Sequence, residues 1–490
     1  MKLISAAIDP RQAVVEPKDC VSGLSSALPG GPWGEKKAFE FPILQRGRYV
    51  RSSPLNDAPG QGHAHWVSED VNGDDQIGYM RQADPDGELI ELRDEQGLLL
   101  SPAVMVARMP EDEGPFYKLY PEGRIAHFDG RRIPAPYFLS DNLYDFNRNF
   151  PYSWAPEPQQ AGAGPYPGSA PETRAVLDFA TRHPHIMVWL NLHTFGGVLI
   201  RPLGDKPDAK MDVGDLALFE QVEAWMTEHT GYPTVSGFHE FLYEPDKPLH
   251  GDLSDCAYHQ RGALAYVVEL WDLFKQLGIE RKKPFVDHYS KFGRKEMRAM
   301  AAFDRQHNKG RIFGTWKKAT HPQLGEVELG GFDPRVGIWN PPYERLPETC
   351  ATQSAAFLRV AALVPRIEVE VVSKDRSGGR TRVELRVINR GYMASHGIPS
   401  AKALPLSEPL RLSVQAQGAT LLAPAQSRVE IGHLDGWGAG LHGGPNMFAP
   451  WTRGNGHEQF VTLVAEGQGT LEVEVGSCRS GYSRLRIDVG

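Results

Sequence analysis

Two short and almost uninterrupted apolar runs lie in the middle of the chain, with a helical pattern between them. The runs cover residues 186–192 and 263–268 and are partly β-branched. Their length and composition predict strands that are buried on both faces. The apolar spacing over 216–229 predicts a helix that ends at Gly231. Strand, helix and strand in this order predict an α/β domain.

A further helix is predicted just before the first of these strands. Ser169 and Glu172 are spaced as in a capping box, in which the two side chains bond the free amides of a helix start. Apolar positions from 176 to 180 continue the helical pattern. Because a residue before proline avoids helical geometry, this helix should end near Pro184.

Beyond Pro365 the pattern changes from helical spacing to alternation of apolar and polar residues. Five stretches alternate in this way: 367–371, 383–387, 410–414, 471–475 and 485–489. Alternating strands joined by glycine-rich turns predict a C-terminal all-β sandwich. We therefore predict three parts: an irregular, turn-rich segment over 1–45, the α/β domain over 46–363 and the β-sandwich over 366–490.

Composition removes several classes of protein. The chain has 490 residues, 41% of them hydrophobic, and a net charge of −8. It can bury a core, and the negative charge argues against nucleic-acid binding. No apolar run reaches the roughly 20 residues of a membrane helix, and the first residues lack a secretory leader. The expected location is the cytoplasm, unless the true N-terminus lies further upstream.

A polar segment at 145–151 is the first candidate for chemistry. It places Asn147 and Arg148 between two aromatic residues and just before a proline. An arginine offers two parallel donors to a carboxylate, and a neighbouring amide can add a third. The alternative is a structural loop in which Arg148 pairs with a nearby aspartate, and residue types alone favour that alternative.

His193 and Glu269 are candidates because of where they stand in the two predicted strands. His193 follows the first apolar run directly, and ligand-binding groups of α/β sheets collect at such strand ends. A histidine of this kind is either a metal ligand or a hydrogen-bonded structural residue. Glu269 continues the second run, where a carboxylate is costly to bury. It is either a general base with a raised pKa or lies just past the buried part.

The segment 70–77 resembles the first half of a calcium loop. Asp70, Asn72 and Asp74 offer oxygen atoms at alternate positions, and an apolar residue follows. Asp75 replaces the usual glycine, and Arg81 stands where such a loop has glutamate. Calcium binding and a solvated acidic turn are both open interpretations.

Taken together, these segments resemble the zinc carboxypeptidase family. The resemblance rests on DFNRNFP (145–151), PETRAV (171–176), HTFGGVLIRP (193–202) and DCAYHQRGALAYVVELWD (255–272), which stand in the family's order and spacing over roughly 46–275. It implies a mixed, largely buried sheet with helices on both faces, followed by the β-sandwich. It also implies that the protein is a zinc-dependent hydrolase of C-terminal peptide bonds.

The resemblance also implies a role for each matching residue. His193 would be the last of three zinc ligands, and Asn147 with Arg148 would hold the terminal carboxylate of the substrate. Glu269 would be the general base that activates the zinc-bound water. Arg51 would polarise the scissile carbonyl, and Tyr243 would close over the substrate, although its spacing to Glu269 differs from the family's.

One departure from the family is large. None of the 17 histidines is followed at the third position by Glu or Asp, so the His-x-x-Glu pair that supplies two zinc ligands is missing. Either the chain begins late within a longer carboxypeptidase, or it is a non-catalytic relative, and we favour the first. A rebuilt site using His63 and His65 is a third possibility. We expect weak zinc binding, and a sheet with an unpaired edge that aggregates or needs a partner.

The leading hypothesis is thus a metallocarboxypeptidase, inactive as written if two ligands are lacking. The alternatives are a deacylase of N-acyl amino acids and a non-catalytic module for C-terminal carboxylates. The expected partner is a peptide or a small acylated amino acid with a free carboxylate, and neither nucleic acid nor membrane is expected. Residues 252–255 are candidates for the pocket that selects the side chain, whose preference the sequence leaves open together with the oligomeric state.

Overall fold

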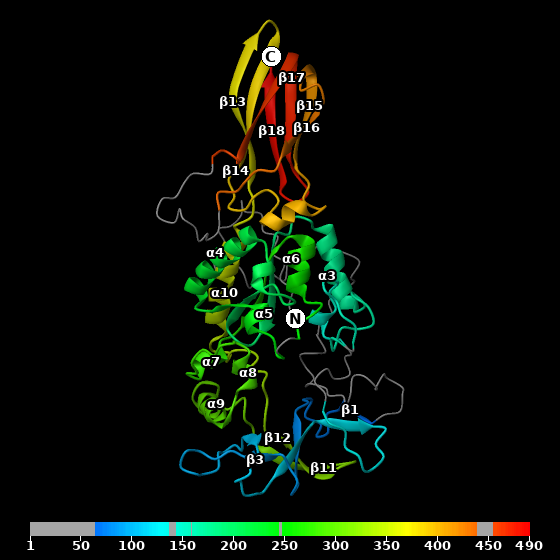
Figure 1. Cartoon of the computed structure of the whole chain (residues 1–490), viewed down its shortest axis with the longest axis vertical. Coiled ribbons are helices and arrows are strands. Elements are labelled where there is room, and N and C mark those ends of the chain that lie inside the picture. Colours follow the sequence, from blue (N-terminus) through cyan, green and yellow to red (C-terminus); the bar gives the residue numbers. More distant parts are fainter. Residues whose placement is uncertain (1–63, 137–143, 158, 245–246, 439–453) are drawn as a thin grey trace.

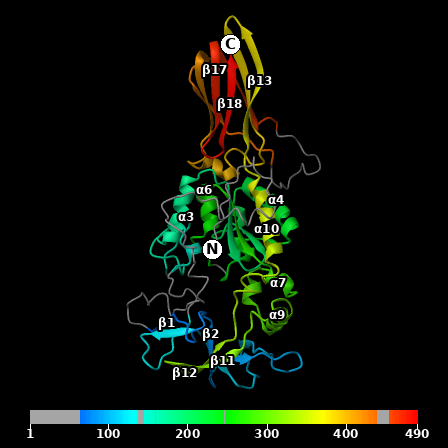
Figure 2. The same cartoon turned by 180° about the vertical axis from the view of Figure 1, so that it is seen from behind.

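The protein is arranged in three tiers along one long axis. The structure, a computed structural model, describes residues 64–136, 144–157, 159–244, 247–438 and 454–490. A β unit built from early residues forms one end, an α/β unit lies in the middle, and a C-terminal β unit forms the other end (Figure 1). The opposite view shows the same order of units (Figure 2).

The first β unit combines strands from two distant parts of the sequence. Its strands are β1 (His65–Ser68), β2 (Tyr79–Ala83), β3 (Leu89–Glu91), β4 (Met105–Ala107), β5 (Tyr117–Pro121), β6 (Gly123–Ala126), β11 (Trp316–His321) and β12 (Gly325–Gly330). Six of them form a sheet in the order β11-β12-β2-β5-β3-β4, and β1 pairs with β6. This separate sheet within the predicted 46–363 domain was not anticipated from the sequence.

Arg81 of β2 holds the hairpin formed by β11 and β12 in this sheet. Its guanidinium lies 4.3 Å from the ring of Tyr117 and 4.7 Å from that of Trp316. It also pairs with Glu91 and Glu328, each at 2.7 Å. A buried arginine needs such partners, so β11 and β12 are fixed to the early strands by packing and by charge.

The α/β unit contains a four-stranded mixed sheet in the order β7-β10-β8-β9. Its strands are β7 (Val188–Thr194), β8 (Val198–Arg201), β9 (Thr234–Ser236) and β10 (Leu264–Leu270). β10 runs parallel to β7 and antiparallel to β8. The two predicted strands are therefore neighbours. Within the described residues β7 lies at one edge of the sheet.

The helices of the described residues lie around this sheet, except the one at 294–307, which packs against β3 and β4 of the first β unit. They are α3 (Pro171–Arg182), α4 (Val213–Thr230), α5 (Gly237–Glu240), α6 (Leu253–Arg261), α7 (Leu273–Gln276), α8 (Asp287–Ser290), α9 (Arg294–His307) and α10 (Leu346–Ala361), with short 3-10 turns η2 (Phe146–Arg148), η3 (Asp208–Lys210) and η4 (Pro399–Ala403). No helix of the described residues is long and apolar enough to cross a membrane.

Both faces of β10 are buried. Tyr266 packs on Phe219 of α4, with ring centroids 5.1 Å apart. Val267, on the opposite face, belongs to a second apolar cluster with Phe274 and Phe285 from the segment after β10. The predicted mixed, largely buried sheet with helices on both faces is confirmed.

The predicted start of α3 was wrong in its capping. The N-cap residue is Ala170, with Pro171 at the first helical position and no side-chain cap. The hydroxyl of Ser169 instead accepts a hydrogen bond from Asn149, at 3.0 Å. The helix nevertheless begins and ends close to the predicted positions, because proline is well suited to the first turn.

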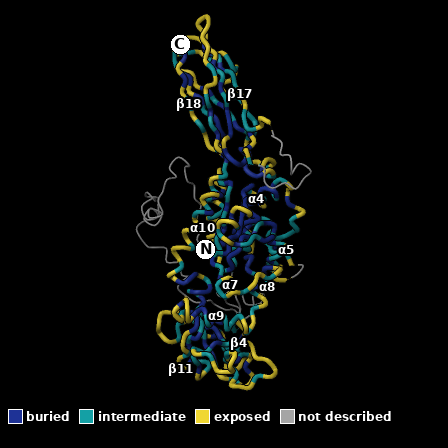
Figure 3. The backbone as a smooth tube through the Cα atoms, turned by 90° about the vertical axis from the view of Figure 1, so that its left-hand side faces the viewer, coloured by how far each residue is buried: buried dark blue, intermediate teal, exposed yellow. Residues whose placement is uncertain are grey.

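The C-terminal unit is the predicted all-β domain. It contains β13 (Ile367–Ser377), β14 (Arg380–Asn389), β15 (Leu410–Ala423), β16 (Arg428–Gly432), β17 (Glu458–Ser477) and β18 (Gly481–Val489). The long strand β17 pairs with β15 on one edge, and on the other first with β14 and then with β18. Alternate side chains form a single core, whereas the tip of the β13–β14 hairpin is exposed (Figure 3).

Arg479, in the turn between β17 and β18, joins this unit to the α/β unit. Its guanidinium is buried and donates to the carbonyls of His396 (2.8 Å), Pro184 (3.2 Å) and Gly262 (2.6 Å). Burial, its largest influence, lowers the pKa of this guanidinium to about 10. The junction is thus a hydrogen-bonded contact across units rather than a loose linker.

Candidate functional site

His193 and Glu269 are brought together by the pairing of β7 with β10. They are register partners in the parallel ladder. The distance from Nδ1 of His193 to Oε1 of Glu269 is 3.7 Å. Glu269 is only 8% exposed, which contradicts the alternative that it lies past the buried part of the strand. Nε2 of His193 and Oε2 of Glu269 are both buried and lack a hydrogen-bond partner among the described residues.

Two glycines after β7 allow this close approach. A side chain at Gly196 would meet Cβ of Glu269 at 3.2 Å and the hydroxyl of Tyr289 at 2.3 Å. Gly197 has φ +63° and donates its amide to the carbonyl of Glu269 at 2.8 Å. This region of φ favours glycine. The two glycines therefore allow the end of β7 to pack closely against the end of β10.

Burial controls the protonation of both groups. It raises the pKa of Glu269 to about 8. It also lowers the pKa of His193, while the charges of Asp252 and Asp145 act in the opposite direction. Buried carboxyl and imidazole groups both favour their neutral forms. The pair can therefore hold a proton near neutral pH, as acid–base chemistry requires.

Asn147 connects three segments around the site. Its amide nitrogen donates to the carboxylate of Asp252 (2.5 Å), the N-cap of α6. Its amide oxygen accepts from the backbone of Leu253 (3.0 Å) and from Asn191 of β7 (3.3 Å). Asn147 thus fixes η2 between α6 and β7, so its first function in the structure is to position its neighbours.

Arg148 follows Asn147, and its guanidinium keeps donors that could bind a ligand. Its Nη1 donates to the carbonyl of Asn147 at 2.7 Å. Among the described residues no carboxylate pairs with its guanidinium, because Asp145 instead accepts the amide of Asn147 and caps η2. The alternative of an arginine paired with a structural aspartate is therefore wrong within the described structure.

Arg148 also lies within electrostatic reach of His193, since its charge lowers the pKa of that histidine. The sequence-predicted residues Asn147, Arg148, His193 and Glu269 thus lie in the same region of the α/β unit. Tyr243 lies in reach too: burial raises the pKa of its hydroxyl, and the charge of Glu269 adds to that effect. Its side chain is nevertheless 60% exposed.

Two further residues at the site were missed by the sequence analysis. Tyr289 of α8 donates to the carbonyl of Phe195 at 2.5 Å, and burial followed by the charge of Glu269 raises its pKa. Asn191 reaches Asn147 from the same face of β7 as His193. The alternation along β7 predicts that Asn191 and His193 share a face. The segment around Tyr289 carries no comparable signal.

The described residues do not complete a zinc site. The unpartnered Nε2 of His193 is suited to one bond with a metal. Within the described ranges, however, no group of three His, Cys, Asp or Glu side chains is placed to hold an ion. Arg51 and His63 lie outside the described residues. His65 lies in β1 of the first β unit, with its ring 5.9 Å from that of His127.

The suspected calcium loop folds around its own backbone. The Asp70 carboxylate accepts from the amides of residues 72, 73, 74 and 75. Asn72 accepts from Asp74, which accepts from Gln76. Asp75, where a calcium loop has glycine, adopts the same left-handed conformation at φ +62°. The three side chains form no ion-holding cluster with other acidic groups among the residues described, so calcium binding stays a prediction.

Comparison with known proteins identifies two regions. Residues 142–280 match the zinc carboxypeptidase family, which confirms the predicted resemblance for that region. Residues 366–488 match a domain of unknown function. The search of curated proteins gives no match.

Two similar solved structures are of thrombin-activatable fibrinolysis inhibitor. The bovine protein, in complex with tick carboxypeptidase inhibitor, shares 19% identity over 39% of this chain and 62% of its own, with a TM-score of 0.22. The other shares 22% identity over 38% of this chain and 47% of its own, with a TM-score of 0.23. The chain thus spans less than two thirds of the length of either of these proteins.

Proposed function

We propose, from the premise that residues 142–280 form a zinc carboxypeptidase domain, that this chain acts on substrates with a free C-terminal carboxylate and hydrolyses their last amide bond. The observation that carries the proposal is the buried pair of His193 and Glu269, each with an unpartnered polar atom, together with Arg148, whose guanidinium has no carboxylate partner among the described residues.

Each residue has a role that its surroundings support. Arg148 would bind the substrate carboxylate by charge-assisted hydrogen bonds. Asn147 would hold Arg148 in place through its bonds to Asp252 and Leu253. Glu269 would accept a proton from the attacking water and return it to the leaving amine. Tyr243 would close over the bound substrate and Arg51 would stabilise the developing oxyanion.

The family implies zinc, and a tight catalytic zinc site has three protein ligands. His193 is suited to be one of them, and the described residues do not supply the others. The residues as described therefore do not fit a complete zinc centre, and the ligands still needed would have to come from outside them.

The deciding experiment measures metal content and turnover on the same preparation. The full chain is purified, its zinc is quantified, and it is incubated with an N-acylated dipeptide that has either a free C-terminal carboxylate or a C-terminal amide. We expect much faster hydrolysis of the carboxylate form than of the amide form. An N-acyl amino acid is included to detect the deacylase activity. Absence of turnover at every zinc concentration would refute the hydrolase.

A second candidate function is that of a non-catalytic module that binds C-terminal carboxylates. It is favoured because the described residues lack a three-ligand metal cluster, while the guanidinium of Arg148 can still bind a carboxylate. It predicts that Arg148→Ala abolishes peptide binding and that Glu269→Ala leaves the dissociation constant unchanged. Peptide binding without hydrolysis would identify this function.

A further inference from the structure

Two segments that belong to different apolar cores meet at the boundary between the α/β unit and the C-terminal β unit. The segment 392–404, which leads from β14 towards β15, packs on the α/β unit, where Met393 and Ile398 belong to the main apolar cluster. Leu434, which follows β16, belongs instead to the core of the C-terminal unit. Ser395 donates its amide to the carbonyl of Leu434 (2.8 Å), and its hydroxyl accepts from the amide of Leu434 (3.0 Å). The contact between the two segments is therefore polar at this point.

Two histidine rings face each other across this boundary. His396 lies on the segment that is anchored to the α/β unit, and His433 directly precedes Leu434 of the C-terminal unit. Their ring centroids are 5.3 Å apart, at an interplanar angle of 85°. His396 is only 8% exposed, and its Nδ1 lies 3.1 Å from the carbonyl of Ile398. Nδ1 of His433 lies 3.5 Å from the hydroxyl of Ser395. Among the described residues, neither ring forms an ion pair with a carboxylate.

The surroundings of both rings disfavour their protonation. Burial is the largest influence: it lowers the pKa of His396 to about 4, and it also lowers the pKa of His433. The bond of His396 to a backbone carbonyl acts in the opposite direction, whereas the charges of His433, Lys402 and Arg479 lower its pKa further. Lys402, on η4, also lowers the pKa of His433, and Glu430 opposes that effect. A proton on either ring would thus enter a buried and largely cationic environment.

The same boundary carries more positive charge around Arg479. The guanidinium of Arg479 donates to three carbonyls, and no carboxylate pairs with it among the described residues. After burial, the charge of Arg261 on α6 lowers the pKa of Arg479, and the thiol of Cys478 acts in the opposite direction. His183 and His185 flank one of the three acceptor residues, and their ring centroids are 5.3 Å apart. Cationic and titratable basic groups therefore lie on both sides of the boundary.

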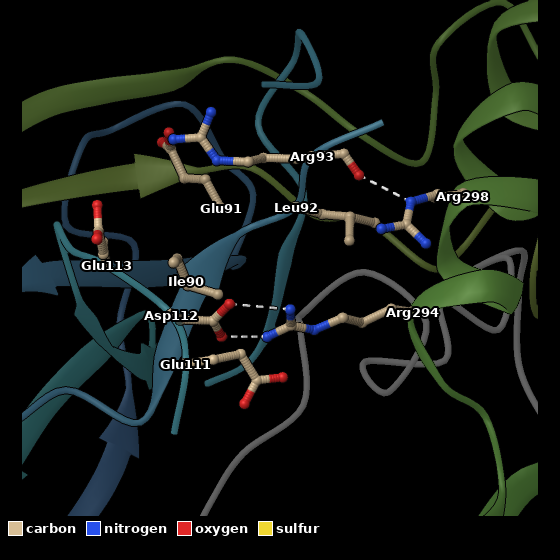
Figure 4. A pocket seen from close by; sticks show the side chains of 9 residues that line it. All are labelled: Ile90, Glu91, Leu92, Arg93, Glu111, Asp112, Glu113, Arg294 and Arg298. Atoms are coloured by element: carbon tan, nitrogen blue, oxygen red, sulfur yellow. Dashed lines mark hydrogen bonds and ion pairs between the residues drawn. The ribbon is translucent and has the colours of Figure 1, made fainter. Parts of the chain in front are cut away.

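Another boundary of the protein is held by opposite charges. Arg294 of α9 binds both carboxylate oxygens of Asp112 across a cleft of about 330 Å³ between α9 and the first β unit (Figure 4). These hydrogen bonds lower the pKa of Asp112 to about 2, so the pair keeps both charges in mild acid. At the boundary with the C-terminal unit, in contrast, mild acid adds positive charge to both sides.

We propose that this boundary is a pH-sensitive switch, in which protonation of His396 and His433 in mild acid releases the C-terminal β unit from the α/β unit while each unit keeps its own core. In the released state a hydrated imidazole titrates near its ordinary pKa of 6.5. The released state therefore takes up protons as the pH falls below 6.5, whereas His396 in the closed state resists protonation down to about pH 4. From His396 alone, the equilibrium constant for release should rise roughly 30-fold between pH 7.5 and pH 5. None of the residues of the carboxypeptidase-type site takes part.

The test is amide hydrogen exchange of the full chain at pH 7.5 and pH 5, corrected for the intrinsic effect of pH on the exchange rate. The amides of Ser395 and Leu434 are bonded across the boundary, so they exchange when it opens. We expect their protection to fall roughly 30-fold or more at pH 5, and protection in β10 and β17 to fall less. An equal fall in β10 and β17 would indicate unfolding of the whole chain in acid and would overturn the switch.

Variants assign the effect to the facing rings. His396→Gln keeps a donor for the carbonyl of Ile398 but cannot gain a proton, so it should remove most of the pH-dependent loss of protection. Lys402→Met, at an exposed position, removes a cation near both rings and should reduce the loss, which decides the matter if His396→Gln disturbs the boundary at pH 7.5. His307→Gln, exposed on α9, is the matched control. Equal protection at both pH values, or an equal loss in the parent chain and both variants, would overturn the switch.

Discussion

His193 and Glu269 lie side by side on parallel strands, and Nδ1 of His193 is 3.7 Å from Oε1 of Glu269. Burial is the main influence on the pKa of each side chain. Seventy-five positions separate the two residues in the sequence, and only the pairing of β7 with β10 makes them neighbours. A buried carboxyl without a cationic partner is costly to fold. The first prediction uses this cost.

Glu269→Gln should strongly reduce turnover and stabilise the fold. Loss of a general base lowers kcat by about 10²–10⁴-fold. Because the folded pKa of about 8 lies above the ordinary value of 4.5, the unfolded chain loses this proton first, and the carboxyl destabilises the fold as pH rises from 4.5 to 8. Kinetics and melts at pH 8 test both effects, with exposed Glu228→Gln as control. Reduced kcat with a lower melting temperature would contradict this interpretation.

Arg148→Met should raise KM for peptides with a free C-terminus. Removal of a charge-assisted bond costs about 1.5–3 kcal/mol, or roughly 10–100-fold in kcat/KM. For a C-terminal amide the variant and the parent chain should behave alike, because that substrate offers no carboxylate. Steady-state kinetics on the two substrates measure the difference, and Arg182→Met, exposed on α3, is the matched control. An equal loss on both substrates would exclude carboxylate recognition.

Arg479→Met should loosen the junction between the α/β unit and the C-terminal unit. The substitution leaves the carbonyls of Pro184, Gly262 and His396 without their donor. Each unsatisfied buried acceptor costs about 1–3 kcal/mol. We expect a lower melting temperature and faster proteolysis near the junction. Arg484→Met, an exposed position on β18 that pairs with Glu474, should cost at most about 1 kcal/mol.

Three histidines predict a loss of stability in mild acid. Burial, the largest influence on each, lowers the pKa of His259 to about 3 and those of His288 and His396 to about 4. The unfolded chain, with histidine pKa near 6.5, therefore takes up protons first as pH falls below that value. In the Glu269→Gln variant, which lacks the opposite effect of that carboxyl, unfolding by urea at pH 7.5 and pH 5 should show lower stability at pH 5. His288→Gln should reduce that difference, whereas exposed His307→Gln should not.

The loop of Asp70, Asn72 and Asp74 predicts stabilisation by calcium. A ligand that binds only the folded state raises the melting temperature, and the stabilisation grows with the logarithm of the ligand concentration divided by the dissociation constant. Titration with Ca²⁺ should raise it, and Asp70→Asn should remove the effect. Mg²⁺ serves as the control ion, because it demands a tighter octahedral shell. An unchanged melting temperature would support the solvated acidic turn.

Much of the fold follows from local pattern. The apolar runs before His193 and up to Glu269 predicted β7 and β10, and the alternating positions after Pro365 predicted five of the six C-terminal strands. The sheet of β2, β3, β4 and β5 with β11 and β12 was not predicted. These strands are short, and the pairing of β12 with β2 joins residues about 250 positions apart.

The sequence by itself determined which residues are candidates for chemistry, because the ends of buried strands and a charged residue in an apolar run are visible without coordinates. Only the tertiary structure decided what those residues have for partners. It showed that Asn147 is bound to Asp252, that Arg148 lacks a carboxylate partner among the described residues, and that Tyr289 lies beside Glu269's strand end. The reason is physical: hydrogen bonds and burial depend on segments that are distant in sequence, and local periodicity carries no information about which of them meet.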